Sequence, residues 1–281
     1  MATIIDGKAL AEHIRTEIAD ESAKLPRKAG LAVILVGNDP ASCVYVANKQ
    51  KDCAQCGFES FEYKLPEETE EEDLLKLIET LNRDDSVDGI LVQLPLPKQI
   101  DGRRIIEAIN PQKDVDAFHP VNVGKMVIGE EGFQPCTPAG VMEMFKAYDI
   151  QLDGKLCVMI GRSNIVGKPM GLLMLRENGT VVYCHSKTAD LAEITRKADI
   201  LVSAVGKQGF ITADMVKDGA VVIDVSINRD AETGKLVGDV LFDEVEKKAS
   251  FITPVPGGVG PMTRAMLMKN VLTAAKLHLG I

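Results

Sequence analysis

The sequence lacks an excess of basic residues, a long apolar run and a secretory leader. Its 32 Lys and Arg are outnumbered by 41 Asp and Glu, and the net charge of −9 argues against binding to nucleic acid or to an anionic membrane surface. No apolar stretch approaches the roughly 20 residues that a membrane-spanning helix needs. The first residues, 1–8, carry no basic segment followed by an apolar one. We therefore expect a cytoplasmic protein.

Cysteine pairs at the spacing of zinc ligands are also scarce. Cys53 and Cys56 form a C-x-x-C pair, but the other cysteines offer no second pair at that spacing, so we expect no metal site. Cysteines of a cytosolic protein are expected to be thiols. This pair falls on the apolar side of a predicted helix, and we interpret both residues as small buried hydrophobic side chains.

Apolar strands and amphipathic helices alternate along the 281 residues, of which 46% are hydrophobic. The first part has three predicted strands, at 31–36, 58–63 and 89–94, and a helix from a Ser42 cap to Gln55. The second part has predicted strands at 156–160, 180–184, 200–205 and 220–225. This spacing is typical of a doubly wound parallel sheet. We predict an α/β protein with two α/β domains and a cleft between them, the second of Rossmann type, with limits at 1–120 and 121–261.

A glycine turn, Gly161-Arg-Ser-Asn-Ile-Val-Gly167, follows the predicted strand 156–160 and opens a predicted helix. Strand, glycine turn and helix form the context of a dinucleotide-binding fingerprint. Gly161 permits the tight turn, Ser163 stands where the second glycine is usual, and Gly167 lets the helix pack close to the strand. The helix N-terminus would present free N–H groups to an anion. The alternative is an ordinary tight turn of an α/β domain.

Tyr45, Lys49, Cys53 and Cys56 share one face of the predicted helix that ends at Gln55. A lysine in an apolar stripe either extends its amine to water or lies in a partly desolvated site. Desolvation lowers the pKa of a lysine, which makes it a usable proton carrier near neutral pH. Periodicity alone slightly favours the first alternative.

Polar residues also stand where predicted strands end. Gln93 lies near the C-terminal end of strand 89–94, where open α/β sheets bind ligands, although a partly exposed strand edge is the alternative. Asp114 and Asp116 would share one face of an extended segment. They could anchor an N–H-rich heterocycle, bind a metal or cap a turn, and the turn is the commonest role beside Pro111.

Six motifs stand in the order of one enzyme family. They are Tyr45-Val-Ala-Asn-Lys49, Val92-Gln-Leu-Pro-Leu-Pro97, Lys113-Asp-Val-Asp116, Gly161-Arg-Ser-Asn-Ile-Val-Gly-Lys-Pro169, Cys184-His-Ser-Lys-Thr188 and Pro256-Gly-Gly-Val-Gly-Pro-Met-Thr263. Over essentially its whole length the chain resembles the bifunctional methylenetetrahydrofolate dehydrogenase/methenyltetrahydrofolate cyclohydrolase family. The resemblance implies oxidation of 5,10-methylenetetrahydrofolate with NADP, and hydrolysis of the methenyl product to 10-formyltetrahydrofolate without a metal.

The resemblance also implies roles for single residues. Lys49 would be the catalytic lysine, tuned by Gln93, while Tyr45 stacks on the aminobenzoate of the folate and Asp116 grips the pterin. The wall between folate and nicotinamide would include Gly257, Gly258 and Val259. Contacts to NADP would come from Gly161, Arg162, Ser163, Ile165 and Ser186. The C-terminal helix, 262–281, would return to the folate-binding domain, and the chain would form a homodimer.

Two departures from the family pattern affect loops. Ala117 stands where many members have glycine after Asp-Val-Asp, and Ser226 stands where many have glycine after Asp224-Val225. Two alternatives to the bifunctional enzyme are an enzyme with only one of the activities and a non-catalytic nucleotide-binding module. The second has no use for Lys49, Gln93 and Asp116 together.

The end of strand 180–184 favours NADP over NAD. A site selective for NAD usually places a carboxylate about 20 residues after the glycine turn, on the ribose hydroxyls. Here His185, Ser186 and Lys187 follow the strand, and Arg162 stands in the glycine turn. Such donors would attract a 2′-phosphate. Alternatively, Lys187 and His185 merely face solvent.

Overall fold

The structure, a computed structural model, describes residues 1–281 apart from the side chain of Ala41. It contains two compact units, each built from two pieces of the chain. The three-stranded unit comprises residues 12–134 and 264–281, and the six-stranded unit comprises residues 1–11 and 135–263. Within the described part of the chain, no helix is both long enough and apolar enough to cross a membrane.

The six-stranded unit contains a sheet in which every strand pairs parallel to its neighbours. In spatial order the strands are β1 (Thr3–Ile4), β11 (Phe251–Ile252), β8 (Val221–Asp224), β7 (Ile200–Ser203), β5 (Leu156–Ile160) and β6 (Thr180–Cys184). The chain passes from β5 outward to β6 and then returns to β7 on the other side of β5. This reversal is the switch point of a doubly wound sheet, so the predicted Rossmann-type α/β fold is confirmed.

The strand β1 and the helix α5 are elements that the sequence patterns do not predict. The two residues of β1 are too few to show a periodicity, yet they pair with β11, which places residues 1–11 in the six-stranded unit. The helix α5 (Pro120–Ile128) begins at the predicted limit between the two domains, where no element is predicted. Residues 121–134 belong to the three-stranded unit. The limits of the compact units therefore differ from the predicted limits 1–120 and 121–261.

Helices cover the six-stranded sheet because its strands are almost wholly apolar. The side chains of one face pack in a buried cluster that includes Val158, Leu201, Val222 and Ile252. The unit also holds a short antiparallel pair and several short helices. These elements are α6 (Cys136–Ala147), α7 (Gly167–Arg176), α8 (Leu191–Thr195), η1 (Ala213–Met215), β9 (Asn228–Arg229), β10 (Leu236–Val237) and α9 (Phe242–Val245).

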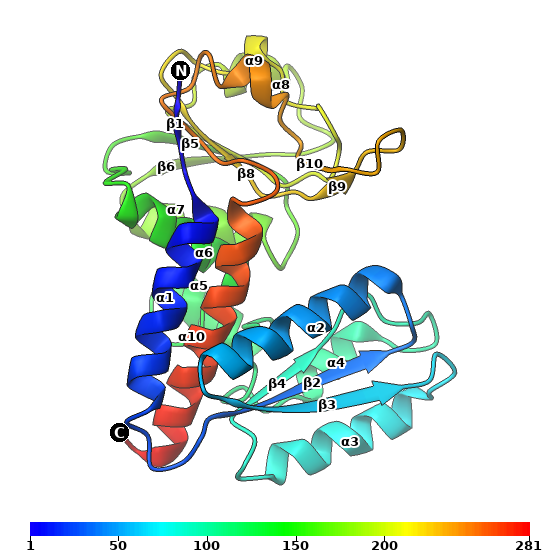
Figure 1. Ribbon diagram of the computed structural model, residues 1–281. Helices are drawn as coiled ribbons and strands as arrows, with labels where there is room; N and C mark the ends of the chain where they lie inside the picture. Colours follow the sequence, from blue (N-terminus) through cyan, green and yellow to red (C-terminus); the bar gives the residue numbers. More distant parts are fainter. The chain divides into compact units, whose positions relative to one another are not determined.

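The three-stranded unit is a smaller parallel sheet of order β3-β2-β4. Its strands are β2 (Gly30–Val36), β3 (Glu59–Leu65) and β4 (Gly89–Val92). Every residue of β2 is buried, because α3 (Glu71–Arg83) and α4 (Gly102–Ala108) pack on one face of the sheet. Figure 1 shows α2 (Pro40–Gln55) on the face opposite α3. Here too the strand order reverses, because the chain passes from β2 to β3 at one edge and then returns to β4 at the other edge.

The start of α2 differs from the prediction. Asp39, and not Ser42, is the N-cap residue, since its carboxylate accepts a hydrogen bond of 2.8 Å from the backbone N–H of Ser42. Pro40 occupies the first turn, where a missing N–H costs little. Ser42 is therefore inside the helix, which begins at Pro40, shortly after β2 ends at Val36.

Two long helices, α1 (Gly7–Ser22) and α10 (Val259–Leu279), contribute most of their residues to the three-stranded unit. Within it they run side by side, blue and orange-red in Figure 1, and Lys276 forms an ion pair with Glu21. The last turn of α10 is also tied to the sheet. The fully buried carboxylate of Asp88 accepts hydrogen bonds from both Nη atoms of Arg27 (2.7 Å each) and from the N–H of Gly30 (2.9 Å). The Nδ1 atom of His278 lies 2.9 Å from the same carboxylate.

We predict that Asp88→Ala destabilises the protein by about 3–5 kcal/mol at pH 7, because it leaves Arg27 without its buried partner. Burial by itself would raise the pKa of Asp88, but the donors around it outweigh that effect and lower it. The stabilising contribution is therefore complete above the unfolded pKa and is lost as the pH falls through the folded pKa. Urea unfolding should show a deficit that shrinks as the pH is lowered. Asp20→Asn, on the exposed side of α1, is the control and should change stability by less than about 0.5 kcal/mol.

Candidate functional site

Lys49 and Gln93 meet at the carboxyl edge of the three-stranded sheet. The Nζ atom of Lys49, on α2, donates a hydrogen bond of 2.9 Å to Oε1 of Gln93. Gln93 follows β4 directly, and its backbone N–H donates to the carbonyl of Ile34 in β2. Its Nε2 atom donates to the carbonyl of Leu94 at 2.7 Å, which fixes the orientation of the amide. Lys49 is half-buried and is held by a polar partner, so the partly desolvated alternative applies.

The other side chains on this face of α2 change from exposed to buried along the helix. Tyr45, one turn before Lys49, is 41% exposed, whereas Cys53 and Cys56 are completely buried free thiols. Burial raises the pKa of each thiol to about 12, so both act as hydrophobic side chains, as predicted. Asp52, buried and three residues after Lys49, pairs with Arg264 of α10 at 3.2 Å. This ion pair fixes the helix that carries Lys49.

Asp114 and Asp116 have different environments. Asp114 is buried and accepts hydrogen bonds from the N–H groups of Phe118 and His119, so of the sequence alternatives it takes the turn-capping one. Asp116 is half-buried and close enough to Lys49 to interact electrostatically. Burial raises the pKa of Asp116 to about 6, Lys49 lowers it, and Asp114 raises it further. Lys49, Gln93 and Asp116 therefore lie together beyond the carboxyl ends of parallel strands, where ligands bind in such folds.

Metal binding has no visible site here. Among the residues that the structure describes, no group of three or more His, Cys, Asp or Glu side chains is arranged to hold a metal ion.

The glycine turn of the six-stranded unit lies at its switch point. Gly161 follows β5 with a φ of +126°, and a Cβ added there would lie 2.6 Å from the carbonyl oxygen of Ala204, which follows β7. A Cβ on Gly167 would lie 2.5 Å from the carbonyl oxygen of Gly161. Neither position has room for a side chain, so both glycines are needed for the close packing of the strand, the turn and the helix.

The N-terminus of α7 differs from the expectation of free N–H groups. The Oγ atom of Ser163 accepts hydrogen bonds of 3.2 Å from the N–H groups of Val166 and Gly167. The N–H of Lys168 donates to the carbonyl of Ser163. Val166 is the N-cap residue, and the side chain of Ser163 satisfies N–H groups at the start of the helix that a second glycine would leave without this partner. Its hydroxyl proton is engaged by neither contact.

The donors predicted for a 2′-phosphate lie at the surface. Arg162, Ser186 and Lys187 are exposed, and His185 is half-buried. Ile165, which the family resemblance places at the cofactor, is exposed as well. The Nδ1 atom of His185 accepts the N–H of Lys187 at 3.2 Å, so that ring is held within its own turn. No carboxylate stands directly after β6. The residues present fit the phosphate groups of NADP.

Two further loops border the cofactor side of the six-stranded sheet. Gly257, with a φ of +108°, accepts a hydrogen bond of 2.9 Å from the N–H of Lys8 through its carbonyl. Gly258 and Val259 are buried directly after it. The hydroxyl of Ser226 donates to the buried Asp239 at 2.8 Å and accepts the N–H of Gly206 at 3.0 Å. Serine at position 226 therefore braces the loop after β7.

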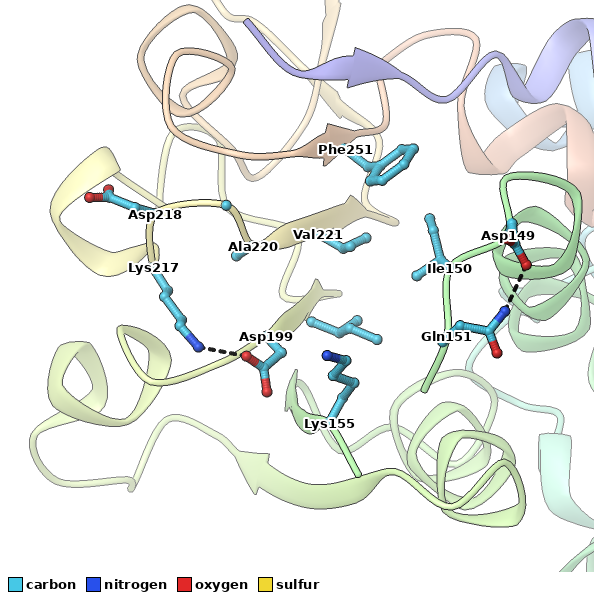
Figure 2. Close-up of a pocket in the computed structure, with 12 residues that line it drawn as sticks. Asp149, Ile150, Gln151, Lys155, Asp199, Lys217, Asp218, Ala220, Val221 and Phe251 are labelled. Carbon is cyan, nitrogen blue, oxygen red and sulfur yellow. Dashed lines mark hydrogen bonds and ion pairs between the residues drawn. The ribbon is translucent and has the colours of Figure 1, made fainter. Parts of the chain in front are cut away.

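A cavity of about 300 Å³ lies at the amino ends of β5, β7, β8 and β11. Figure 2 shows its polar rim, where Lys217 pairs with Asp199 at 2.6 Å and Gln151 donates to Asp149 at 2.7 Å. Parallel strands place this cavity at the sheet edge opposite to Gly161. Dinucleotides bind at the carboxyl edge, so this cavity is not the cofactor site.

Comparison with known proteins identifies both units. Residues 5–116 match the model of the tetrahydrofolate dehydrogenase/cyclohydrolase catalytic domain, and residues 135–279 match that of the NAD(P)-binding domain of the same family. The chain belongs to the tetrahydrofolate dehydrogenase/cyclohydrolase family.

Individual members of the tetrahydrofolate dehydrogenase/cyclohydrolase family are similar over the whole chain. The bifunctional protein FolD of Agathobacter rectalis is 60% identical over 279 residues, which cover 98% of this chain and 100% of that protein. The crystal structure of the bifunctional FolD of Campylobacter jejuni is 53% identical, with a TM-score of 0.97 and 99% of each chain covered. The FolD structure of Trypanosoma brucei, complexed with NADP and an inhibitor, is 40% identical, with a TM-score of 0.96 over 100% of this chain and 99% of that one.

Sequence reasoning missed the buried carboxylates that hold these loops. Asp239 accepts hydrogen bonds from the hydroxyl of Ser203 and from the N–H groups of Val205 and Lys207, at 2.7 to 2.9 Å. Asp52, which pairs with Arg264, was likewise not singled out. An aspartate at a helix or loop position is usually solvated, so nothing local in the sequence marks either residue as buried.

We predict that Asp116→Asn stabilises the folded chain at pH 7 by about 1–3 kcal/mol. The folded pKa of about 6 lies above the ordinary value of 3.8, so ionisation of Asp116 destabilises the folded chain. This effect develops between the two pKa values and is complete above the folded one. The gain should vanish below about pH 4, where the carboxyl group is protonated in both states. Urea unfolding at several pH values measures this. Equal stability of the variant and the wild type at pH 7 would contradict the environment assigned to Asp116.

Proposed function

We propose that this member of the tetrahydrofolate dehydrogenase/cyclohydrolase family oxidises 5,10-methylenetetrahydrofolate with NADP and hydrolyses the methenyl product to 10-formyltetrahydrofolate. The observation that carries the proposal is the hydrogen bond between Lys49 and Gln93, with Asp116 beside Lys49. A polar set of this kind at the carboxyl edge of the three-stranded sheet suits a reaction that moves protons near an ionic substrate. A non-catalytic nucleotide-binding module would have no use for it.

Each residue of the set has a proposed role in substrate binding or proton transfer. The methenyl carbon is already a cationic electrophile, so attack by water needs a proton acceptor and an oriented substrate. Lys49 is the proposed acceptor, and Gln93 holds its amine in position. Asp116 would accept hydrogen bonds from the N–H groups of the pterin, and the exposed ring of Tyr45 would stack on the aminobenzoate.

The six-stranded unit is the proposed NADP-binding part. Gly161 and Gly167 would let the backbone of the turn approach the pyrophosphate, and Ser163 would donate its hydroxyl proton to a phosphate oxygen. Arg162 and Ser186, with Ile165 packing nearby, are the proposed contacts to the adenosine end. Bound NADP supplies the acceptor for the hydride that leaves the methylene carbon.

Further parts of the proposal rest on the sequence and the family resemblance. The three-stranded unit would bind the folate, and the loop Gly257, Gly258 and Val259 would form part of the wall between folate and nicotinamide. A cytoplasmic location and a homodimeric state complete the proposal. An enzyme with only one of the two activities is the narrower alternative, and the first experiment below measures both activities separately.

We predict that Lys49→Gln lowers the rate of methenyl-folate hydrolysis by about 10²–10⁴-fold, the usual contribution of general acid–base catalysis. The variant should still bind the cofactor and should accumulate methenyl-folate wherever it still forms. Absorbance of methenyl-folate follows its formation and decay separately. Lys49→Arg should not restore full hydrolysis, because a guanidinium does not release its proton near neutral pH.

Lys51→Gln is the matched control, because Lys51 lies two residues away on α2 and is exposed. Its hydrolysis rate should equal that of the wild type. Undiminished hydrolysis in Lys49→Gln would remove Lys49 from the mechanism.

We predict that Arg162→Ala weakens NADP binding by roughly tenfold to a hundredfold and leaves NAD nearly unaffected. A hydrogen bond between charged groups is worth roughly 1.5–3 kcal/mol, and each 1.4 kcal/mol is about tenfold in affinity. The measurement is kcat/KM with both cofactors, for the wild type, Arg162→Ala and the control Arg176→Ala, an exposed arginine in the last turn of α7. Equal losses for both cofactors would place Arg162 on the shared pyrophosphate. A wild type that prefers NAD would contradict the assignment of the strand end.

A further inference from the structure

Asp114 is a buried carboxylate that the proposed mechanism does not use. It is 2% exposed and forms an isolated parallel bridge with Ile90 of β4, so it marks where the chain leaves the edge of the three-stranded sheet. The neighbouring Lys113 is also buried and donates hydrogen bonds to the carbonyls of Leu81 (3.0 Å) and Asp84 (2.7 Å). The backbone before the turn is thus anchored.

Both carboxylate oxygens of Asp114 hold the turn that follows. Oδ1 accepts from the N–H of Phe118 at 3.2 Å, and Oδ2 accepts from the N–H of His119 at 2.8 Å. Oδ2 also accepts a hydrogen bond of 2.8 Å from Nδ2 of Asn122, a buried residue of α5. The same Nδ2 donates to the carbonyl of Pro111 at 2.9 Å, so Asn122 joins both ends of the turn.

Asp116 lies inside this closed turn, next to a residue with an unfavourable backbone conformation. Ala117 has a φ of +60°, in the left-handed region that residues with a Cβ rarely adopt. Its N–H donates to the carbonyl of Asp114 at 3.1 Å. Because alanine does not favour this conformation by itself, the contacts of Asp114 must impose it, and the direction of the Asp116 side chain depends on them.

We propose that Asp114 is a positioning residue, which closes the turn 114–119 and thereby aims the carboxylate of Asp116 at the folate beside Lys49. The inference rests on the proposed function, because it assigns Asp116 to the substrate. Asp114 itself accepts hydrogen bonds from backbone N–H groups and from Asn122. Asn122 has the same positioning role, because its uncharged amide donates the second hydrogen bond to Oδ2 of Asp114.

The charges around Asp116 provide a test that distinguishes this positioning role from a general loss of structure. Two charged groups act on Asp116, namely Lys49 from α2 and Asp114 from its own turn, while His119 acts on Asp114. Lys49 lowers the pKa of Asp116 and Asp114 raises it. Removing the charge of Asp114 therefore lowers the pKa of Asp116, whereas removing the side chain of Asn122 leaves the charge of Asp114 in place.

The experiment measures KM and kcat for methenyl-folate hydrolysis between about pH 5 and 8 in Asp114→Asn, Asn122→Ala, Asp116→Asn and the exposed control Asp20→Asn. In Asp114→Asn we expect KM to rise about tenfold and kcat to fall less. The acidic limb of the profile, which is the fall of kcat/KM on the acid side, should move to lower pH. In Asn122→Ala we expect KM to rise while the acidic limb stays at the same pH. Circular dichroism establishes that each variant is folded.

Unchanged KM and an unchanged acidic limb in folded Asp114→Asn would overturn the inference. If Asp114→Asn does not fold, Asn122→Ala decides, and an unchanged KM there overturns it as well. Asp116→Asn separates this outcome from a failure of the proposed function. A rise of KM in Asp116→Asn alone would leave the function standing and remove the role of Asp114, whereas no rise in Asp116→Asn would remove Asp116 from the substrate site.

Discussion

Parallel pairing of the strands is the constraint on which both candidate sites depend. A parallel connection must return the chain to the amino end before the next strand begins, so the segments that leave the carboxyl ends gather at one edge. In the three-stranded sheet this edge brings Gln93 to Lys49. In the six-stranded sheet it brings Gly161 against Ala204. Two units of different size thus place their candidate functional residues by the same rule.

Buried carboxylates then fix the loops at these edges. Asp114 holds the turn of Asp116, and Asp239 accepts four hydrogen bonds of 2.7 to 2.9 Å from the last residue of β7 and from the segments after β7 and β8. A buried carboxylate is costly unless donors surround it, so such groups hold one loop conformation and disfavour others. The side chains proposed to bind ligands are accordingly held in position before a ligand arrives.

The turn around Asp116 gives up stability for this placement. Ala117 is held at a φ of +60°, and burial keeps the pKa of Asp116 at about 6, above its ordinary value. Conformational and electrostatic strain of this kind persists only where neighbouring contacts impose it, and it gathers at functional sites. The contrast with Asp88, whose pKa is lowered by its partners, separates a stabilising carboxylate from one suited to a ligand.

Periodicity, glycine spacing and motif order were enough to predict the α/β class, most strands and the family, because these features are encoded by neighbouring residues. They also located Lys49, Gln93 and Asp116 as residues of interest, but left each with a structural alternative. Only the tertiary structure decided that Lys49 donates to Gln93, 44 positions away, and that Asp114 caps a turn with Asn122. The two-residue β1 and the contacts of Ser163 with the start of α7 were decided in the same way. Each depends on hydrogen bonds and burial that arise when residues are brought together by folding, and a local pattern contains no record of them.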